Sequence, residues 1–276
     1  MSTNYLKLIN IGNLLTYDSK KKSMVSEKCL EIIINDGNIV DIGKNLSPTD
    51  EVYDCKNNLV TPGFVDCHTH PVFYNDRSNE FEMRVAGSTY EQIAVSGGGI
   101  NKSVKSLRNS DYEKLKKKVS QRMDNFLKLG TTTLEAKSGY GLDLDSELKS
   151  LAILDEINSE HSVDIIPTFM GAHAVPEEYN NKTSDYVDHL CKVIIPAVAK
   201  QGIARYNDVF CEKGYFDIHQ SEKILATGLG YGLLPRIHTD EFQNIGGSSL
   251  ASHLKCISAD HLMCVKDSDI LKMVDA

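Results

Sequence analysis

The sequence lacks several features that would set it apart from ordinary globular enzymes. It contains no tryptophan, and its seven cysteines are scattered without a C-x-x-C pair. An odd number of cysteines without framework spacing argues against a disulfide scaffold and is typical of reduced thiols in the cytoplasm. No apolar run approaches the roughly 18 residues of a membrane span, and the opening MSTNYLKLINIGNLL lacks a signal-peptide cleavage pattern. We therefore expect a cytoplasmic protein that does not enter a membrane.

Positive charge is also scarce. The chain has 30 lysines and arginines against 38 aspartates and glutamates, which gives a formal net charge of −8. Binding to nucleic acid or to an anionic membrane surface requires clustered positive charge. The one lysine-dense stretch, EKLKKKVSQR at 113–122, is interspersed with apolar residues and indicates a solvated helix face. The composition therefore predicts no nucleic-acid partner.

The first quarter of the chain consists of short apolar stretches separated by turn residues. NDGN at 35–38 places an Asp-Gly step between two β-branched runs, which is a strong signal for a β-hairpin. TPG at 61–63 then marks a boundary. We predict that residues 1–63 form a small antiparallel β segment, one half of a composite β domain, and that residues 64–276 form a second domain.

Beyond residue 63 the pattern changes to strands that alternate with helices. The helix patterns cover 110–130, 145–158 and 184–202. Ser110 and Glu113 have the spacing of a capping box, and Pro196 must bend or end the third helix. The strand candidates are 64–70, 131–138, 163–173, 206–213, 234–240 and 256–262.

Strand–helix alternation of this kind indicates an α/β fold with a parallel sheet. A doubly wound open sheet would need a glycine-rich phosphate loop just after its first strand, and SGGGI at 96–100 comes far too late. We therefore predict a (β/α)₈ TIM-type barrel that is incomplete, with about six strand–helix units. Functional side chains in such barrels lie at the C-terminal ends of the strands.

Five of the nine histidines end or follow a predicted strand: His68, His70, His173, His238 and His261. Each alone is better explained as an ordinary core or loop imidazole. Taken together they would converge at one mouth of a barrel, where neutral imidazoles can bind a divalent transition metal. The first two lie two residues apart on a strand and so point to the same face.

A carboxylate follows one of these histidines closely. In RIHTDEF at 236–242, Glu241 comes three residues after His238. A carboxylate beside a metal can carry a proton to or from a reacting group. Asp240 has two open interpretations, a helix N-cap or a hydrogen-bond partner of a ligand.

Several motifs now carry a resemblance to a known family. PGFVDCHTH resembles the first-strand signature of the amidohydrolase superfamily. From about residue 60 onward, EAKSGYGLD, TFMGAHAVP, VFCEKGYFD, IHTDEF and SADHL together resemble the imidazolonepropionases. That resemblance implies a hydrolase that opens the C–N bond of 4-imidazolone-5-propanoate to give N-formimidoyl-L-glutamate in histidine degradation.

The resemblance also implies roles for particular residues. One divalent metal, zinc or iron, is bound by His68, His70 and His238 and activates water. The substrate carboxylate pairs with Arg77, and the remaining expected contacts are made by Tyr140, His173, Glu241 and His261, of which the last two engage the ring and its carbonyl. Some relatives carry a modified bridging lysine, but Lys137 lies on the second strand candidate and does not match that position. The family commonly forms dimers, so a homodimer is a further expectation.

One family feature is missing. The family's fourth ligand is an aspartate at the end of the eighth strand, whereas this sequence stops at DSDILKMVDA after six strand candidates. Two alternatives therefore stay open. Beside the hydrolase, the chain could be a catalytically impaired, truncated paralogue that binds metal or ligand, or a metal-dependent nucleobase deaminase, since those enzymes also use H-x-H and a later H-x-x-E. Arg77 and KSGYG favour a substrate that carries a carboxylate.

Overall fold

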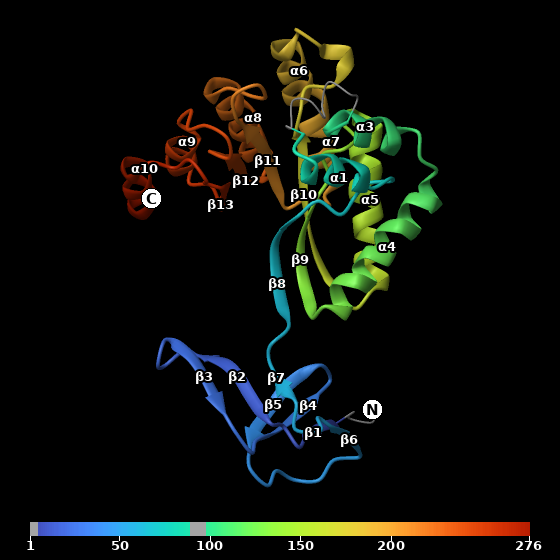
Figure 1. Ribbon diagram of the computed structural model, residues 1–276, viewed down its shortest axis with the longest axis vertical. Coiled ribbons are helices and arrows are strands. Elements are labelled where there is room, and N and C mark those ends of the chain that lie inside the picture. The colour runs from blue at the N-terminus through green and yellow to red at the C-terminus, as the bar shows by residue number, and fades with distance from the viewer. Residues whose placement is uncertain (1–4, 89–97) are drawn as a thin grey trace. The chain divides into compact units, whose positions relative to one another are not determined.

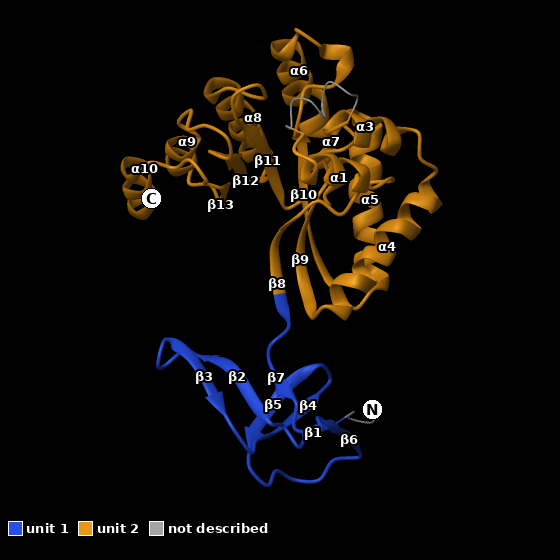
Figure 2. Ribbon diagram, in the orientation of Figure 1, with its two compact units in different colours: residues 1–64 blue, residues 65–276 orange. Residues whose placement is uncertain are grey.

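The computed structural model describes residues 5–88 and 98–276 (Figure 1). The first two residues of SGGGI, at 96 and 97, lie outside the described residues. The chain divides into two compact units, Met1–Phe64 and Val65–Ala276, which Figure 2 distinguishes by colour. Among the described residues, no helix has both the length and the apolar character that a membrane crossing requires.

The first unit consists of two small β-sheets. The predicted hairpin joins β4 to β5 antiparallel, and its turn uses positive φ at Asp36 (46°) and Gly37 (78°). The pairings of β1 with β6 and of β2 with β7 are parallel. A small core is formed by Ile11, Leu14, Ile32 and Cys55. The strand orders are β5-β4-β1-β6 and β3-β2-β7, with β1 (Tyr5–Ile9), β2 (Asn13–Asp18), β3 (Ser23–Glu27), β4 (Glu31–Asn35), β5 (Asn38–Gly43), β6 (Glu51–Asp54) and β7 (Leu59–Val60).

The second unit contains one six-stranded sheet whose strands follow each other in sequence order. Neighbouring strands run parallel from β9 to β13, with helices between them, as a (β/α) barrel requires. The prediction of an incomplete TIM-type barrel with six units is therefore confirmed. The strands are β8 (Phe64–Thr69), β9 (Thr131–Lys137), β10 (Asp164–Ala172), β11 (Tyr206–Cys211), β12 (Leu234–Thr239) and β13 (Ser258–His261).

Helices and loops connect these strands on the outer side (Figure 1). The helices are α1 (Ser78–Val85), α3 (Ile100–Arg108), α4 (Tyr112–Lys128), α5 (Leu144–Glu160), α6 (Thr183–His189), α7 (Ile195–Gln201), α8 (Ile218–Gly230), α9 (Gly247–His253) and α10 (Asp267–Asp275), with a 3₁₀ turn at Glu177–Tyr179. A π-helical turn at Leu190–Ile194 separates α6 from α7, and Pro196 lies in the first turn of α7, where its missing N–H is tolerated.

The prediction that Ser110 caps the helix at 110–130 is wrong by one residue. The N-cap of α4 is Asp111, whose side chain accepts a hydrogen bond from the amide of Lys114. The hydroxyl of Ser110 instead donates to the carbonyl oxygen of Leu107 at the end of α3. Asp and Ser are equally good N-caps, so the spacing alone did not distinguish the two neighbours.

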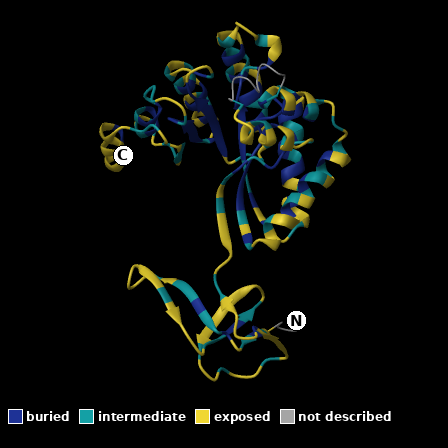
Figure 3. Ribbon diagram, in the orientation of Figure 1, coloured by how far each residue is buried: buried dark blue, intermediate teal, exposed yellow. Residues whose placement is uncertain are grey.

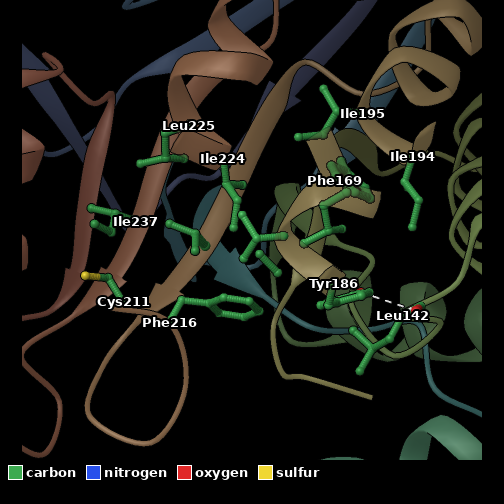
Figure 4. Close-up of a cluster of buried hydrophobic side chains, with 14 of the residues drawn as sticks. Leu142, Phe169, Tyr186, Ile194, Ile195, Cys211, Phe216, Ile224, Leu225 and Ile237 are labelled. Carbon is green, nitrogen blue, oxygen red and sulfur yellow. Dashed lines mark hydrogen bonds between the residues drawn. The ribbon is translucent and has the colours of Figure 1, made fainter. Parts of the chain in front are cut away.

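The core of the second unit lies between the sheet and its outer helices. Figure 3 shows that the strands from β9 to β12 are mostly buried. Figure 4 shows the larger cluster, in which Phe169 of β10 and Ile237 of β12 pack with Ile224 and Leu225 of α8. Tyr186 is also buried there and donates hydrogen bonds to the carbonyl oxygens of Leu142 (3.2 Å) and Gly171 (2.8 Å). This core fixes the strand ends that carry the predicted site.

Candidate metal centre and active site

The structure brings the five predicted histidines together at the C-terminal ends of the strands. His68 lies in β8 and His70 just beyond it, while His238 lies in β12. The Nε2 atom of His70 is 3.3 Å from Nε2 of His68 and 3.2 Å from Nε2 of His238. Ligand nitrogens about 2.0–2.1 Å from a tetrahedral ion are themselves about 3.3 Å apart. Both distances from His70 therefore match the spacing of ligands around one metal ion.

Carboxylates hold two of these imidazoles from behind. Nδ1 of His238 is 2.9 Å from Oδ1 of Asp208, and Nδ1 of His68 is 3.0 Å from Oδ2 of Asp260. An ionised carboxylate only accepts hydrogen bonds, so Nδ1 of His238 carries the proton and its Nε2 presents a lone pair toward the centre. Carboxylate–histidine pairs of this kind orient metal ligands in many proteins.

Burial keeps the imidazoles of His70, His173 and His238 neutral. It lowers the pKa of His238 to about 4, although the charge of Asp208 opposes the shift. Burial also lowers the pKa of His173 to about 3, and together with the neighbouring histidines it holds the pKa of His70 well below the usual value. A neutral imidazole is the form that binds a metal.

The residues present fit a divalent transition metal. In the part of the chain that the structure describes, Nδ1 of His70 is buried without a hydrogen-bond partner, which leaves this imidazole with no polar anchor except the histidine cluster. Ligand atoms of His68, His238 and His261 also lie within 4.8 Å of one another. His70 and His261 therefore both lie near His68 and His238, and His70 makes the two nitrogen contacts of 3.2–3.3 Å. Three imidazoles suit both zinc and iron.

A buried ionic network lies beneath the histidines, and sequence reasoning missed it. Lys137, which is fully buried, donates to Glu135 Oε1 and Asp208 Oδ2, each at 2.8 Å, and its Nζ lies 3.8 Å from Asp260. Burial lowers the pKa of Lys137, but Asp208 and Glu135 outweigh it, so the net shift is upward and the amine stays charged. This pairing agrees with the rejection of Lys137 as a modified bridging ligand.

A second cation of the network spans the interior of the barrel. Arg236 of β12 donates to the carbonyl oxygen of Cys67 in β8 at 2.9 Å and lies 3.6 Å from Asp260 in β13. One signal for the network was available in the sequence. Asp208 falls inside the otherwise uncharged strand Tyr206–Cys211, where an ionisable residue is rare unless it is paired.

Three of the predicted substrate contacts, Arg77, Tyr140 and His173, lie on the side of the predicted metal site toward His70. His70, Arg77 and Tyr140 all line a cavity of about 130 Å³. The ring of His173 stacks on that of His70 with centroids 4.9 Å apart and lies 5.1 Å from the ring of Tyr140. Arg77 is the N-cap of α1, and its guanidinium is 3.8 Å from Glu80, which is too long for a hydrogen bond.

The glycines of KSGYG make the loop of Tyr140 possible. Gly139 has a φ of 97°, and a Cβ there would lie 2.9 Å from the carbonyl oxygen of Met170. A Cβ on Gly141 would lie 2.7 Å from the backbone of Ser146. The carbonyl oxygen of Gly139 also accepts from Nδ1 of His173 at 2.9 Å. The loop therefore sets two of the predicted site residues at once.

Glu241 and His261 lie together on the other side of the metal site. Glu241 follows β12, and its Oε2 atom is 3.6 Å from Nε2 of His261 at the end of β13. The ring of His261 is 5.2 Å from the rings of His68 and His238. His261 has a φ of 78°, a strained value that persists only where surrounding contacts hold it.

Asp240 has a structural position. It is fully buried, and its carboxylate accepts from the side chains of Thr239 (3.2 Å), Asn244 (3.2 Å) and Ser248. The N-cap of α9 is Gly246, so the N-cap interpretation of Asp240 is wrong. Its hydrogen bonds fasten the loop after β12 to α9, and none of them goes to a predicted metal ligand.

Comparison of the sequence with known proteins gives consistent relatives. No family model matches the chain. The imidazolonepropionase of Brevibacillus brevis is 46% identical over 226 residues, which are 82% of this chain and 53% of that protein. The imidazolonepropionase of Haloarcula marismortui is 42% identical over 253 residues, 89% of this chain and 60% of that protein. The chain thus spans about half to three fifths of the length of these curated relatives.

Solved structures share the fold at low sequence identity. Ochratoxinase of A. niger matches with a TM-score of 0.64 and 13% identity, over 100% of this chain and 64% of that one. Guanine deaminase of C. acetobutylicum has a TM-score of 0.60 at 15% identity, over 99% and 66%. An adenosine deaminase of Xanthomonas campestris, solved with bound zinc, has a TM-score of 0.56 at 12% identity, over 98% and 60%. The chain is therefore similar in sequence to the imidazolonepropionases over 82–89% of its length, and it shares the fold of these solved enzymes.

Proposed function

We propose that this protein contributes to hydrolysis of the C–N bond of 4-imidazolone-5-propanoate to N-formimidoyl-L-glutamate, in the cytoplasm. The observation that carries the proposal is the position of His70, whose Nε2 atom is 3.3 Å from that of His68 and 3.2 Å from that of His238, two imidazoles that each lie within 3.0 Å of a carboxylate. His68, His70 and His238 would bind one zinc or iron ion. When bound, such an ion supplies a Lewis acid and lowers the pKa of water.

Residues on the two sides of the proposed metal site are proposed to contact different parts of the substrate. Arg77 is proposed to pair with the propanoate, because a guanidinium fork matches both carboxylate oxygens. It lines the same cavity as Tyr140, whose hydroxyl is proposed to contact the substrate. His173 is neutral and is held by Gly139, so it can offer the substrate a fixed imidazole edge.

The other side of the site is proposed to handle protons. Glu241 and His261 approach within 3.6 Å, close enough to exchange a proton after a small adjustment. His261 lies beside His68 and His238, and we propose that it and Glu241 engage the ring and its carbonyl and do not bind the metal. We propose that Glu241 moves the proton and that His261 orients the carbonyl.

Turnover measurements on the purified, metal-loaded protein test this assignment. The protein is supplied with 4-imidazolone-5-propanoate, cytosine or guanine, and the absorbance of each is followed. We expect loss of the imidazolone alone. Turnover of a nucleobase instead would move the assignment to a deaminase, and one bound metal per chain with no turnover of any compound would support a metal-binding, inactive protein.

The carboxylate contact is tested separately with a matched pair of variants. Arg77→Met should raise KM about 10- to 100-fold, since a charge-assisted hydrogen bond contributes about 1.5–3 kcal/mol. Arg84→Met removes an exposed cation from the same helix and should leave KM unchanged. Equal KM values for the two variants would remove Arg77 from the site.

A further inference from the structure

Two buried glutamates each bind a loop that carries a predicted site residue. Glu147 lies in the first turn of α5 and has no exposed surface, and Glu212 follows β11 and is 1% exposed. Neither is a predicted ligand or substrate contact. Their carboxylates accept hydrogen bonds from backbone amides of loops at the C-terminal end of the sheet.

Glu147 binds the loop of Tyr140. Its Oε1 atom accepts from the amides of Gly139 (3.2 Å), Gly141 (2.8 Å) and Leu142 (2.9 Å). These amides come from both sides of Tyr140. Leu142 has a φ of 54°, a conformation that a leucine adopts only when other contacts stabilise it. One carboxylate thus fixes the backbone on both sides of the tyrosine.

Glu212 binds the loop of Glu241 in the same way. Its Oε2 atom accepts from the amides of Glu241 and Phe242, both at 3.0 Å, and its Oε1 atom accepts from the amide of Gln243 at 3.2 Å. The preceding residue, Asp240, has a φ of 54°. The three amides that directly follow this strained residue therefore all donate to one carboxylate.

A carboxylate suits this task better than its amide counterpart. An ionised carboxylate accepts at both oxygens, whereas a glutamine would direct an N–H group at backbone N–H groups on one side. A buried donor left without an acceptor is costly, so that side of the loop would separate from the glutamine. The two loops thus depend on the carboxylate groups as well as on shape, most fully at Glu212, where both oxygens accept backbone amides.

We propose that Glu147 and Glu212 are positioning residues, which set Tyr140 and Glu241 respectively by binding the loop amides around them. The inference rests on the proposed function for the roles of Tyr140 and Glu241. The loop contacts themselves do not depend on it. Since the two glutamates bind different loops, each serves as the control for the other.

Hydrogen–deuterium exchange of Glu147→Gln and Glu212→Gln tests the loop contacts without reference to activity. Glu212→Gln should speed exchange of the amides at 241–243 about 10-fold or more and leave those at 139–142 unchanged, and Glu147→Gln should do the reverse. Similar acceleration of both loops in each variant, or none in either, would overturn the proposal. If a Gln variant fails to fold, the Asp variant, which keeps the charge but is one methylene shorter, replaces it.

Kinetics then separate positioning from a purely structural role. Glu212→Gln should lower kcat about 100-fold, because displacing a catalytic group by about 1 Å has that effect. Glu147→Gln should mainly raise KM, about 10-fold, through Tyr140. Zinc affinity should stay within about twofold in both variants. Altered exchange with unchanged kcat and KM would overturn the positioning role. If the unsubstituted protein shows no turnover, the proposed function fails, and the exchange data alone decide whether the glutamates set the loops.

Discussion

The central strands and the edge strands of the six-stranded sheet contribute to the same site, but they differ in burial and in the number of neighbouring strands. β11 is buried at every residue, and β12 is buried at all but its first. β8 and β13 each pair on one side only within the described sheet, and Val65 in β8 is 70% exposed. His238 therefore comes from the rigid centre, whereas His68 comes from an edge.

The difference shows how an edge strand can still present a ligand accurately. His68 is fixed by Asp260 on the opposite edge, and Arg236 reaches from β12 to the backbone of Cys67. Lys137 lies beneath and pairs with the carboxylate behind His238. Packing and the buried pair of Asp208 and Lys137 position the central ligand, whereas the edge ligand depends on contacts from Asp260 and Arg236.

The largest difference between the centre and the edge of the sheet should be in how far a substitution lowers the free energy of unfolding. Phe169→Ala, in the central cluster, should lower the free energy of unfolding by about 3–5 kcal/mol, because it leaves a cavity among fully buried side chains. Val65→Ala, at the exposed edge, should change it by less than about 0.5 kcal/mol. Urea unfolding of both variants measures this. Similar losses would mean that the edge is as tightly packed as the centre.

Metal affinity should depend most on the central ligand. His238→Ala removes one of the three nitrogens and leaves Asp208 without its partner, so zinc affinity should fall by more than the roughly 10- to 100-fold typical of changes behind a ligand. Competition with a chelating dye measures this. His253→Ala, on the surface of α9, is the control and should bind zinc normally.

Acid should destabilise the metal-free protein through the central histidines. The pKa of His238 is lowered to about 4 and that of His173 to about 3, from an ordinary value of 6.5. Below pH 6.5 the unfolded chain therefore binds protons that the folded chain does not, and stability falls by up to about 1.4 kcal/mol per pH unit for each histidine. Urea midpoints between pH 7 and 5 measure the slope. A slope that His173→Gln leaves unchanged would contradict this origin.

The smallest expected difference is in zinc affinity between variants of the two carboxylates next to the ligands, Asp208 and Asp260. Asp208→Asn should weaken zinc binding about 10- to 100-fold, since Asp208 binds both His238 and Lys137 in a fully buried position. Asp260→Asn should have an effect near the lower end of that range, because Asp260 lies at the edge and keeps 15% of its side chain exposed. Equal effects would mean that the two halves of the site are equally rigid.

Local patterns predicted most of the fold. All six barrel strands lie within their predicted ranges, because apolar runs bounded by turn residues specify strands locally. The hairpin at 35–38 follows from the Asp-Gly step in the same way. The N-cap of α4 was missed because two adjacent residues could both cap, and only the geometry of the preceding loop selects one.

The site was predictable to the extent that strand ends converge. His68, His70, His173, His238 and His261 meet because a barrel brings the ends of its strands to one mouth. The residues behind them were not predicted. Lys137 is a buried amine whose partners come from positions 2 and 71 residues away, and no local pattern encodes such a pairing.

By itself the sequence determined the order of strands and helices, and with it the face on which the histidines gather. Only the tertiary structure decided which nitrogens approach within 3.3 Å, which carboxylates orient them and which glutamates bind the loops. The physical reason is the distance along the chain over which each interaction acts. Periodicity and turn chemistry act over a few residues, whereas the pairing of buried charges depends on neighbours that become adjacent only when the sheet has formed.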